Sequence, residues 1–267
     1  MEFSLKDLQN SILSILIEIK RICEKHNLKY ILYGGSCLGA VRHNGFIPWD
    51  DDADIAMPRK DYEKFIKLCK EGALESEFYL QDFSEEEPNY YSPWIRIRKN
   101  NTLCVIQYHK DDGFRHLGVF VDIFPFDYCS TSNFTNIEKQ FKKYSKAQRN
   151  FANKIAFKTR TFKSKLLRLF LLPKSKQKLL KERDFATKEL TDLNNKQCII
   201  DFNSAYGIKK AVFPADLFDE LIECKFENNL FLIPKKYDSM LTIMYGNYME
   251  LPPIEKRVAH MPKEIKL

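Results

Sequence analysis

The chain has 267 residues, 44% of them hydrophobic and 13% aromatic, which suits one large core, or one core with an appended subdomain, and excludes disorder over most of the length. No apolar run is long enough to span a bilayer, and the N-terminus shows no signal-peptide pattern. The net charge of +7 is uneven, because residues 138–184 carry 16 Lys/Arg against 3 Asp/Glu and leave an acidic remainder, an asymmetry that indicates a surface meeting phosphates.

The N-terminal segment predicts an amphipathic helix. Ser4 and Asp7 have the spacing of a capping box, and apolar residues recur every three or four positions from Leu5 to about His26. A strand is expected next, over 29–33, followed by a Gly-Gly-Ser turn whose serine caps a short helix. The other elements expected in the first half are a strand over 52–57, a helix over 59–69, and strands over 78–83, 94–99, 104–108 and 119–124.

The second half begins with a basic, helical stretch. Residues 136–194 predict two helices separated at Pro173, residues 226–233 a hairpin, and residues 234–245 a helix ended by Gly246. We therefore predict an α+β fold with a mixed sheet. Its expected parts are a catalytic core over 1–135, a basic helical subdomain over 136–195, and a C-terminal section over 196–267 that completes the core and the rim of the active site.

Seven cysteines are dispersed along the chain, and none forms a C-x-x-C pair. An odd and scattered set favours free thiols in a reducing compartment over disulfides, and it argues against a zinc site.

The run Asp50-Asp51-Asp52-Ala53-Asp54 is the strongest chemical feature. Asp52 and Asp54 stand two apart on the predicted strand, so they share a face, and two adjacent carboxylates are tolerated when a divalent cation neutralises them. Asp50 shares that face if the strand begins earlier. Asp122 stands alone in an apolar strand, which is costly unless the carboxylate is paired or bound to metal. An isolated D-x-D more often lies on a solvated loop, but here a Gly-Gly-Ser turn precedes it.

Several stretches resemble the LicD phosphocholine transferase family, which includes bacterial LicD proteins and the eukaryotic fukutin and fukutin-related proteins. The first is the run from Tyr33 to Ile55, YGGSCLGAVRHNGFIPWDDDADI. The others are VDIFPFD at 121–127, YGNYM at 245–249, and Pro252-Pro253 with His260. The resemblance reaches both ends of the chain and shows no departure at the three carboxylates.

The resemblance implies a nucleotidyltransferase-like fold and a site that binds Mg²⁺, or Mn²⁺ in its place. Asp52 and Asp54 would be the metal-binding pair, and Asp122 would complete the metal site or act as general base. Gly35 and Ser36 would contact the nucleotide phosphates. The donor would be CDP-choline or another CDP-alcohol, and CMP would be released. The acceptor would be a hydroxyl of a cell-surface glycan, such as lipopolysaccharide or teichoic acid, or of its lipid-linked precursor.

Further substrate contacts are expected from arginines, which pair with phosphates, and from residues of the family-like stretches. Arg96 and Arg98 share a strand face that is solvated if it has no such role, and Trp49 either stacks on a base or choline or buttresses the acidic loop. The expected substrate-binding residues, beside Gly35 and Ser36, are Arg42, Trp49, Arg59, Arg96, Arg98, Asp127, Arg257 and His260.

The basic segment suits contact with an anionic membrane surface, which would place a cytoplasmic enzyme on the inner face of the bacterial membrane beside lipid-linked acceptors. The alternative is a solvated basic helix packed on the acidic body. No nucleic-acid-binding motif accompanies the charge. Two other functions stay open, transfer of the nucleotidyl group itself and non-catalytic binding of a glycan or membrane.

Overall fold

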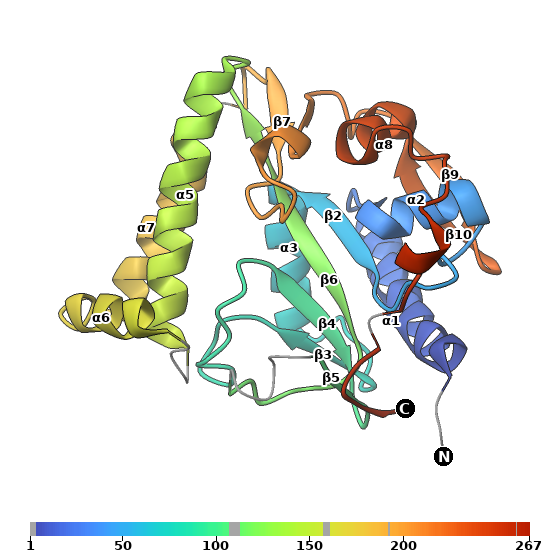
Figure 1. Cartoon of the computed structure of the whole chain (residues 1–267), viewed down its shortest axis with the longest axis horizontal. Coiled ribbons are helices and arrows are strands. Elements are labelled where there is room, and N and C mark those ends of the chain that lie inside the picture. The colour runs from blue at the N-terminus through green and yellow to red at the C-terminus, as the bar shows by residue number, and fades with distance from the viewer. Residues whose placement is uncertain (1–3, 107–112, 157–160, 192, 260) are drawn as a thin grey trace.

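In the computed structural model, which describes residues 4–106, 113–156, 161–191, 193–259 and 261–267, a mixed sheet forms the centre of the molecule (Figure 1). Its main strands stand in the order β1-β2-β6-β4-β3, and β7 and β8 continue it beyond β6. The bounds are β1 Ile31–Tyr33, β2 Asp54–Pro58, β3 Phe78–Gln81, β4 Ile95–Lys99, β6 Phe120–Cys129, β7 Cys198–Ile200 and β8 Val212–Pro214. The α+β class and the mixed sheet are confirmed.

Strand β6 organises this sheet. Its first half pairs in parallel with β2 and antiparallel with β4, and its last three residues pair antiparallel with β7. It runs five residues beyond the predicted end at residue 124, because Phe126 and Cys129 continue the buried pattern. One strand therefore connects the N-terminal half of the sheet to the strands that follow the basic segment.

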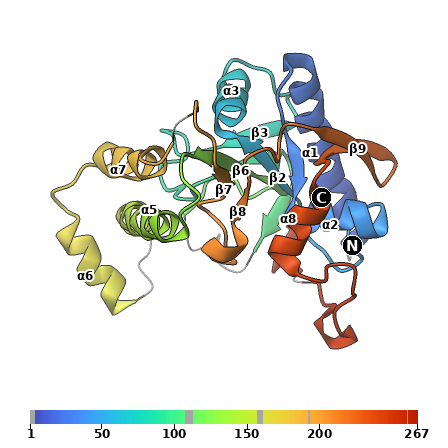
Figure 2. The same cartoon turned by 90° about the horizontal axis from the view of Figure 1, so that it is seen from above.

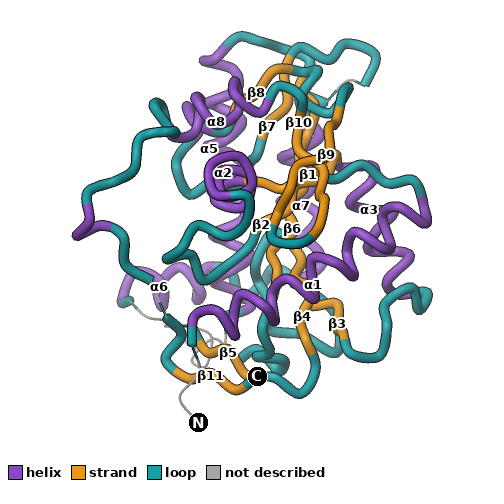
Figure 3. The backbone as a smooth tube through the Cα atoms, turned by 90° about the vertical axis from the view of Figure 1, so that its right-hand side faces the viewer, coloured by secondary structure: helices purple, strands orange, loops and turns teal. Residues whose placement is uncertain are grey.

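Helices α1 (Leu5–His26) and α3 (Arg59–Lys70) pack against the sheet, α1 on β4 and β6 and α3 on β2, β3 and β6. The predicted capping box of α1 is present, since Ser4 Oγ accepts from Asp7 N at 3.2 Å while the Asp7 carboxylate accepts from Ser4 N at 3.0 Å. The apolar stripe of α1 is buried, and left-handed Asn27 ends the helix. Helix α2 (Gly34–His43) follows β1 and lies beside β2, as Figure 3 shows end-on.

Three helices fill the basic stretch, namely α5 (Phe134–Ile155), α6 (Phe162–Phe170) and α7 (Lys176–Lys188). Pro173 separates α6 from α7, as predicted, but two helices rather than one precede it, so the prediction of two helices is wrong. Helices α5 and α7 pack on each other, whereas α6 stands at the edge of the molecule (Figure 2). Two small buried clusters serve this region, one of them built on Phe151, Ile155, Leu171 and Leu179.

The C-terminal section returns to the body of the molecule. The predicted hairpin is β9 (Leu221–Phe226) with β10 (Asn229–Pro234), and α8 (Tyr237–Tyr245) ends at Gly246 as predicted. Two short 3-10 turns flank these elements, η1 (Ile208–Lys210) before the hairpin and η2 (Ile254–Lys256) after α8. The last strand, β11 (Glu264–Lys266), pairs with β5 (Leu103–Val105). The two ends of the chain thus lie on one body.

All seven cysteines are free thiols, as expected. Among the residues described, no helix is long and apolar enough to cross a membrane.

Candidate functional site

Asp54 and Asp122 open the site, because parallel pairing of β2 and β6 places them side by side in register. Side chains alternate along strands. Ile55 and Ile123, the next residues on each strand, are fully buried, so the two carboxylates point to the opposite and more open face. Asp122 was expected to join the other carboxylates from a neighbouring strand, whereas its parallel register with Asp54 was not predicted.

Asp50 and Asp52 join the pair from the loop before β2. The prediction that Asp52 begins the strand is wrong, since β2 starts at Asp54. Asp52 still lies close to Asp54, and its carboxyl group is next to that of Asp50. The loop therefore brings Asp52 close to Asp54, although the two residues were expected to meet on one face of a strand.

The charges of these aspartates are poorly compensated. Burial, followed by repulsion from Asp52, raises the pKa of Asp54 well above its ordinary value. Burial and neighbouring carboxylates likewise raise the pKa of Asp50 to about 7 and that of Asp52 to about 6. Asp52 is exposed to solvent nonetheless. It is thus an accessible carboxylate in a crowded, acidic setting, which favours a cationic ligand.

The two glycines at the start of α2 make room for these carboxylates. Gly34 has φ +59°, and a Cβ there would lie 3.2 Å from Asp54 Oδ2. A Cβ on Gly35 would lie 2.8 Å from Asp50 Oδ2, closer than side chains tolerate. The turn that was predicted to approach a phosphate lies against the acidic cluster.

Ser36 fixes the position of β2. The expected cap is wrong, because α2 begins at Gly34 and Ser36 lies within its first turn. Its buried Oγ accepts a hydrogen bond from Asp54 N at 2.9 Å. Ser36 therefore positions Asp54, and we leave it out of the set that contacts substrate.

Asp122 is held by Arg96. Arg96 Nε donates to Asp122 Oδ1 at 2.5 Å and Nη2 donates to Oδ2 at 3.4 Å, in a pair whose side chains are 6% and 13% exposed. Arg98 shares the strand face, as predicted, but its side chain is fully buried and donates to Gln81 and to the Gly118 carbonyl. Both guanidinium groups stack on Phe120. These contacts give both arginines internal roles, and we leave Arg98 out of the proposed site.

The donor set suits a hard divalent cation, because Asp52 and Asp54 offer oxygen ligands whose mutual repulsion a cation relieves. Within the described parts of the chain, however, no three His, Cys, Asp or Glu side chains are arranged as a metal site. Asp50 and Asp52 are neighbours, and Arg96 engages both oxygens of Asp122. The oxygen ligands of Asp52 and Asp54 and their closeness therefore fit a metal ion, whereas Asp122 is already engaged by Arg96.

Two arginines flank the acidic loop. Arg257 lies over the Trp49 ring at 5.6 Å, and Trp49 contacts His43 edge-on. Arg42 donates to the carbonyls of Tyr248 and Glu250 at 2.6 and 3.2 Å, so it ties the C-terminal section to α2. Burial and the nearby Arg257 lower the pKa of Arg42. Two cations that repel each other beside this loop form a setting suited to an anion.

Arg59 and Asp127 lie elsewhere. They form a two-pronged ion pair at 2.8 and 2.7 Å, with Asp127 buried. Five residues of strand separate Arg59 from Asp54, and five separate Asp127 from Asp122, which is roughly 16 Å of extended chain. The ion pair is therefore at the far end of β2 and β6, and we leave both residues out of the proposed site.

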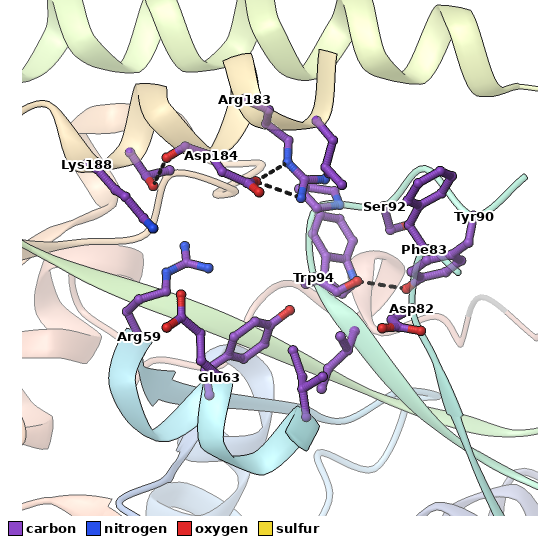
Figure 4. A pocket seen from close by; sticks show the side chains of 16 residues that line it. Arg59, Glu63, Asp82, Phe83, Tyr90, Ser92, Trp94, Arg183, Asp184 and Lys188 are labelled. Atoms are coloured by element: carbon purple, nitrogen blue, oxygen red, sulfur yellow. Dashed lines mark hydrogen bonds and ion pairs between the residues drawn. The ribbon is translucent and has the colours of Figure 1, made fainter. Parts of the chain in front are cut away.

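Arg59 instead borders a cavity of about 220 Å³ between α3, the segment before β4, and α7 (Figure 4). Arg183 and Lys188 approach from α7, and Trp94 and Tyr90 form the opposite wall, where Tyr90 donates to the Trp94 carbonyl at 2.9 Å. The labelled basic side chains alternate with Glu63, Asp82 and Asp184, so the lining favours neither anion nor cation.

Three residues near the carboxylates escaped the sequence prediction. Tyr245 Oη lies 3.6 Å from the position of a Gly34 Cβ, and Tyr245 packs edge-on against Tyr206. Asp201, which is 1% exposed, accepts from Tyr33 Oη at 3.1 Å and from Asn203 N at 2.8 Å. Burial raises its pKa to about 7. Only the YGNYM stretch pointed to Tyr245, and His260 lies outside the described residues.

The comparisons with known proteins agree with this geometry. Residues 27–170 match the family described as "LicD/FKTN/FKRP, nucleotidyltransferase domain", and the chain belongs to this family. The match covers α2, the acidic loop, β2 and β6, which carry the cluster.

The similarity to one relative extends over nearly the whole chain. The lipopolysaccharide cholinephosphotransferase LicD of Haemophilus influenzae is 27% identical over 284 aligned positions, covering 98% of each protein. The ribitol 5-phosphate transferase FKRP of Homo sapiens is 28% identical over 96 positions, covering 31% of this chain and 19% of FKRP. The first relative therefore includes the basic segment and the C-terminal section in its alignment.

Proposed function

We propose that this protein transfers a phosphoalcohol group, phosphocholine in the first instance, from a CDP-alcohol to a hydroxyl of a cell-surface glycan or its lipid-linked precursor. The observation that carries the proposal is the aspartate cluster at the Gly34-Gly35 turn, with Arg42 and Arg257 nearby. Family membership and the near-full-length similarity to a cholinephosphotransferase support it.

In the proposed reaction, the acceptor hydroxyl oxygen forms a bond to the phosphorus that carries choline. The bond between that phosphorus and the oxygen bridging to CMP breaks, CMP leaves with the bond electrons, and the hydroxyl proton is released. Phosphoryl transfer of this kind depends on positioning and charge neutralisation more than on covalent catalysis. Asp52 and Asp54 would hold Mg²⁺ or Mn²⁺, which supplies positive charge to the diphosphate when bound.

The residues of the chain divide this work by position. We assign Arg257 and Arg42 to binding the negatively charged part of the donor. The Trp49 ring, which lies beneath Arg257, is assigned to stacking on the donor. Arg96 holds Asp122 beside Asp54, so Asp122 is assigned a supporting carboxylate role. Gly35 and Ser36 set the positions of Asp50 and Asp54.

A screen of CDP-alcohols for cation-dependent binding tests the proposal directly. We expect CDP-choline, CDP-ethanolamine, CDP-glycerol or CDP-ribitol to bind more tightly with Mg²⁺ than with chelator, and the Asp52→Asn/Asp54→Asn variant to lose that gain. Equal binding of all four donors with and without cation, in both proteins, would contradict it. Transfer of the nucleotidyl group remains the second candidate, since the same carboxylates serve attack on the other phosphorus.

A further inference from the structure

Helix α6 presents an apolar face to solvent. Within the described residues of this helix no side chain is buried, and Phe162, Leu169 and Phe170 are 81%, 61% and 73% exposed. Leu166 is 46% exposed. At 3.6 residues per turn, positions 162, 166, 169 and 170 fall on one face of the helix. A helix of a water-soluble body normally turns such a face inward.

The opposite face of α6 holds the helix to the protein. Ser164, Leu167 and Arg168 are half-buried, at the three- and four-residue spacing that defines the inner side. Leu167 packs against the cluster of Phe151 and Leu171, and Arg168 Nη1 donates to the Ala156 carbonyl at 3.1 Å. The orientation of α6 is therefore fixed by its own contacts, and its apolar side chains are the exposed ones. The helix lies at the edge of the molecule (Figures 1 and 2).

Basic side chains border this apolar face. Lys163 and Lys165 flank it on the helical wheel, and both are exposed. Residues 161–181 contain seven Lys/Arg and no Asp or Glu. Leu172, just after α6, adds another side chain that is 61% exposed. Apolar side chains bordered by lysines are the pattern of a helix that lies in the interface of an anionic bilayer.

We infer that the outer face of α6, formed by Phe162, Leu166, Leu169 and Phe170 with Lys163 and Lys165, docks this protein on a membrane surface rich in anionic lipid. The apolar side chains enter the acyl boundary, and the lysines meet lipid phosphates. This surface is separate from the aspartate cluster, and its binding does not depend on which group the enzyme transfers.

Charge decides among the occupants of this face. Pairing with a second copy would bring together two segments that each contain 16 basic and 3 acidic residues over 138–184. Such pairing is unfavourable because the two positively charged segments repel each other. A nucleic acid would satisfy the lysines but leave four large apolar side chains in water. An anionic bilayer satisfies both kinds of side chain at once.

Co-sedimentation of the full-length protein with vesicles tests the inference, with phosphatidylcholine alone compared with phosphatidylcholine mixed with phosphatidylglycerol. We expect binding to the mixed vesicles only. The variant F162S/L169S/F170S, which keeps every charge, should bind at least about tenfold more weakly, because insertion drives the contact. K163Q/K165Q should bind about tenfold more weakly at low salt and differ less at high salt.

A matched pair provides the control. Leu166 on α6 and Leu230 on β10 are 46% and 45% exposed, so Leu166→Ser and Leu230→Ser remove the same side chain from equally open positions. Only the first should weaken vesicle binding. Far-ultraviolet circular dichroism and thermal unfolding show that each variant is folded.

Three outcomes would overturn the inference: equal sedimentation with neutral and mixed vesicles, equal loss in L166S and L230S, or no loss in the triple variant. Tighter binding to duplex DNA than to mixed vesicles, unaffected by the triple variant, would assign the surface to nucleic acid instead. Turnover of a CDP-alcohol with a water-soluble saccharide should be unchanged in F162S/L169S/F170S, so a failed membrane assay and a failed transferase assay are distinguishable.

Discussion

Asp54 and Asp122 are direct neighbours on two parallel strands, although they are 68 positions apart in the sequence. Each strand continues into fully buried residues, so the two carboxylates stand at the border between core and site. Asp50 and Asp52 approach the same place from a loop, and two glycines leave them space. The predictions below test what this arrangement does.

Asp54→Asn should separate activity from stability. Burial and neighbouring carboxylates disfavour the charged form of Asp54, so replacing it with an uncharged Asn should raise the free energy of unfolding at pH 7.5. Turnover should fall by at least about 100-fold, because the cation site loses a ligand. CMP release and thermal unfolding measure the two effects. Glu63→Gln, an exposed carboxylate on α3, should change neither.

Gly35→Ala should impair the site with little loss of stability. The added Cβ would lie 2.8 Å from Asp50 Oδ2, and the carboxylate can move away because it ends a side chain. We expect a stability cost below about 1 kcal/mol and a roughly tenfold fall in turnover through displacement of Asp50. A double-mutant cycle with Asp50→Ala tests the cause. If the two substitutions reduce turnover independently, displacement of Asp50 is not the reason.

Asp201→Asn should remove one pH-dependent part of the stability. The pKa of Asp201 is about 7 in the folded protein and 3.8 in an exposed aspartate. Between about pH 4 and 7 the folded state keeps a proton that the unfolded chain has released, so wild-type stability falls as pH rises through this window. The stability of the variant relative to wild type should grow over the same window, by on the order of 4 kcal/mol, and then level off.

Urea unfolding of both proteins at pH 5, 6, 7 and 8, at intervals of about one pH unit, measures the difference in their free energies of unfolding. The other raised carboxylates are present in both proteins, and the variant also removes the part of the Asp54 pKa rise that Asp201 causes. A difference that does not change between pH 5 and 8 would show that Asp201 is already charged in the folded protein.

Arg257→Gln should change KM for CDP-choline and leave stability nearly unchanged, whereas Arg59→Gln should do the reverse. Arg257 lies over Trp49 beside the acidic loop, so its loss should raise KM for CDP-choline by about tenfold and leave stability nearly unchanged. Arg59 pairs with buried Asp127, so its loss should cost about 3 kcal/mol of stability and leave KM unchanged. A rise in KM for Arg59→Gln equal to that for Arg257→Gln would return Arg59 to the donor site.

Most of the elements were predictable because local signals define them. The capping box and apolar period set α1, Gly246 ended α8, and turn residues marked the hairpin after Phe226. Boundaries were missed where long-range pairing decides. Asp52 is outside β2 because β1 pairs with β2 only from Asp54 onward, and β6 lengthens because β7 offers it a partner.

The site was predictable in its residue types and less so in its contacts. The acidic run and Asp122 were evident from sequence, whereas the ion pairs of Arg96 with Asp122 and of Arg59 with Asp127 depend on the register between distant strands. Asp201 carried no local signal, since it becomes unusual only when Tyr33 and Asn203 surround it. The hydrophobic periodicity of a sequence predicts which face of a helix or strand a side chain lies on, but it does not predict which distant residue that side chain contacts.

The fate of the two halves of the donor tests the central claim most directly. CDP-choline labelled separately in cytidine and in choline is incubated with pooled surface glycans and their lipid-linked precursors. We expect the choline label on glycan and the cytidine label in free CMP, only with a divalent cation and not with Asp54→Asn. Cytidine label on the glycan with free phosphocholine, or transfer that is as fast in Asp54→Asn, would contradict the account.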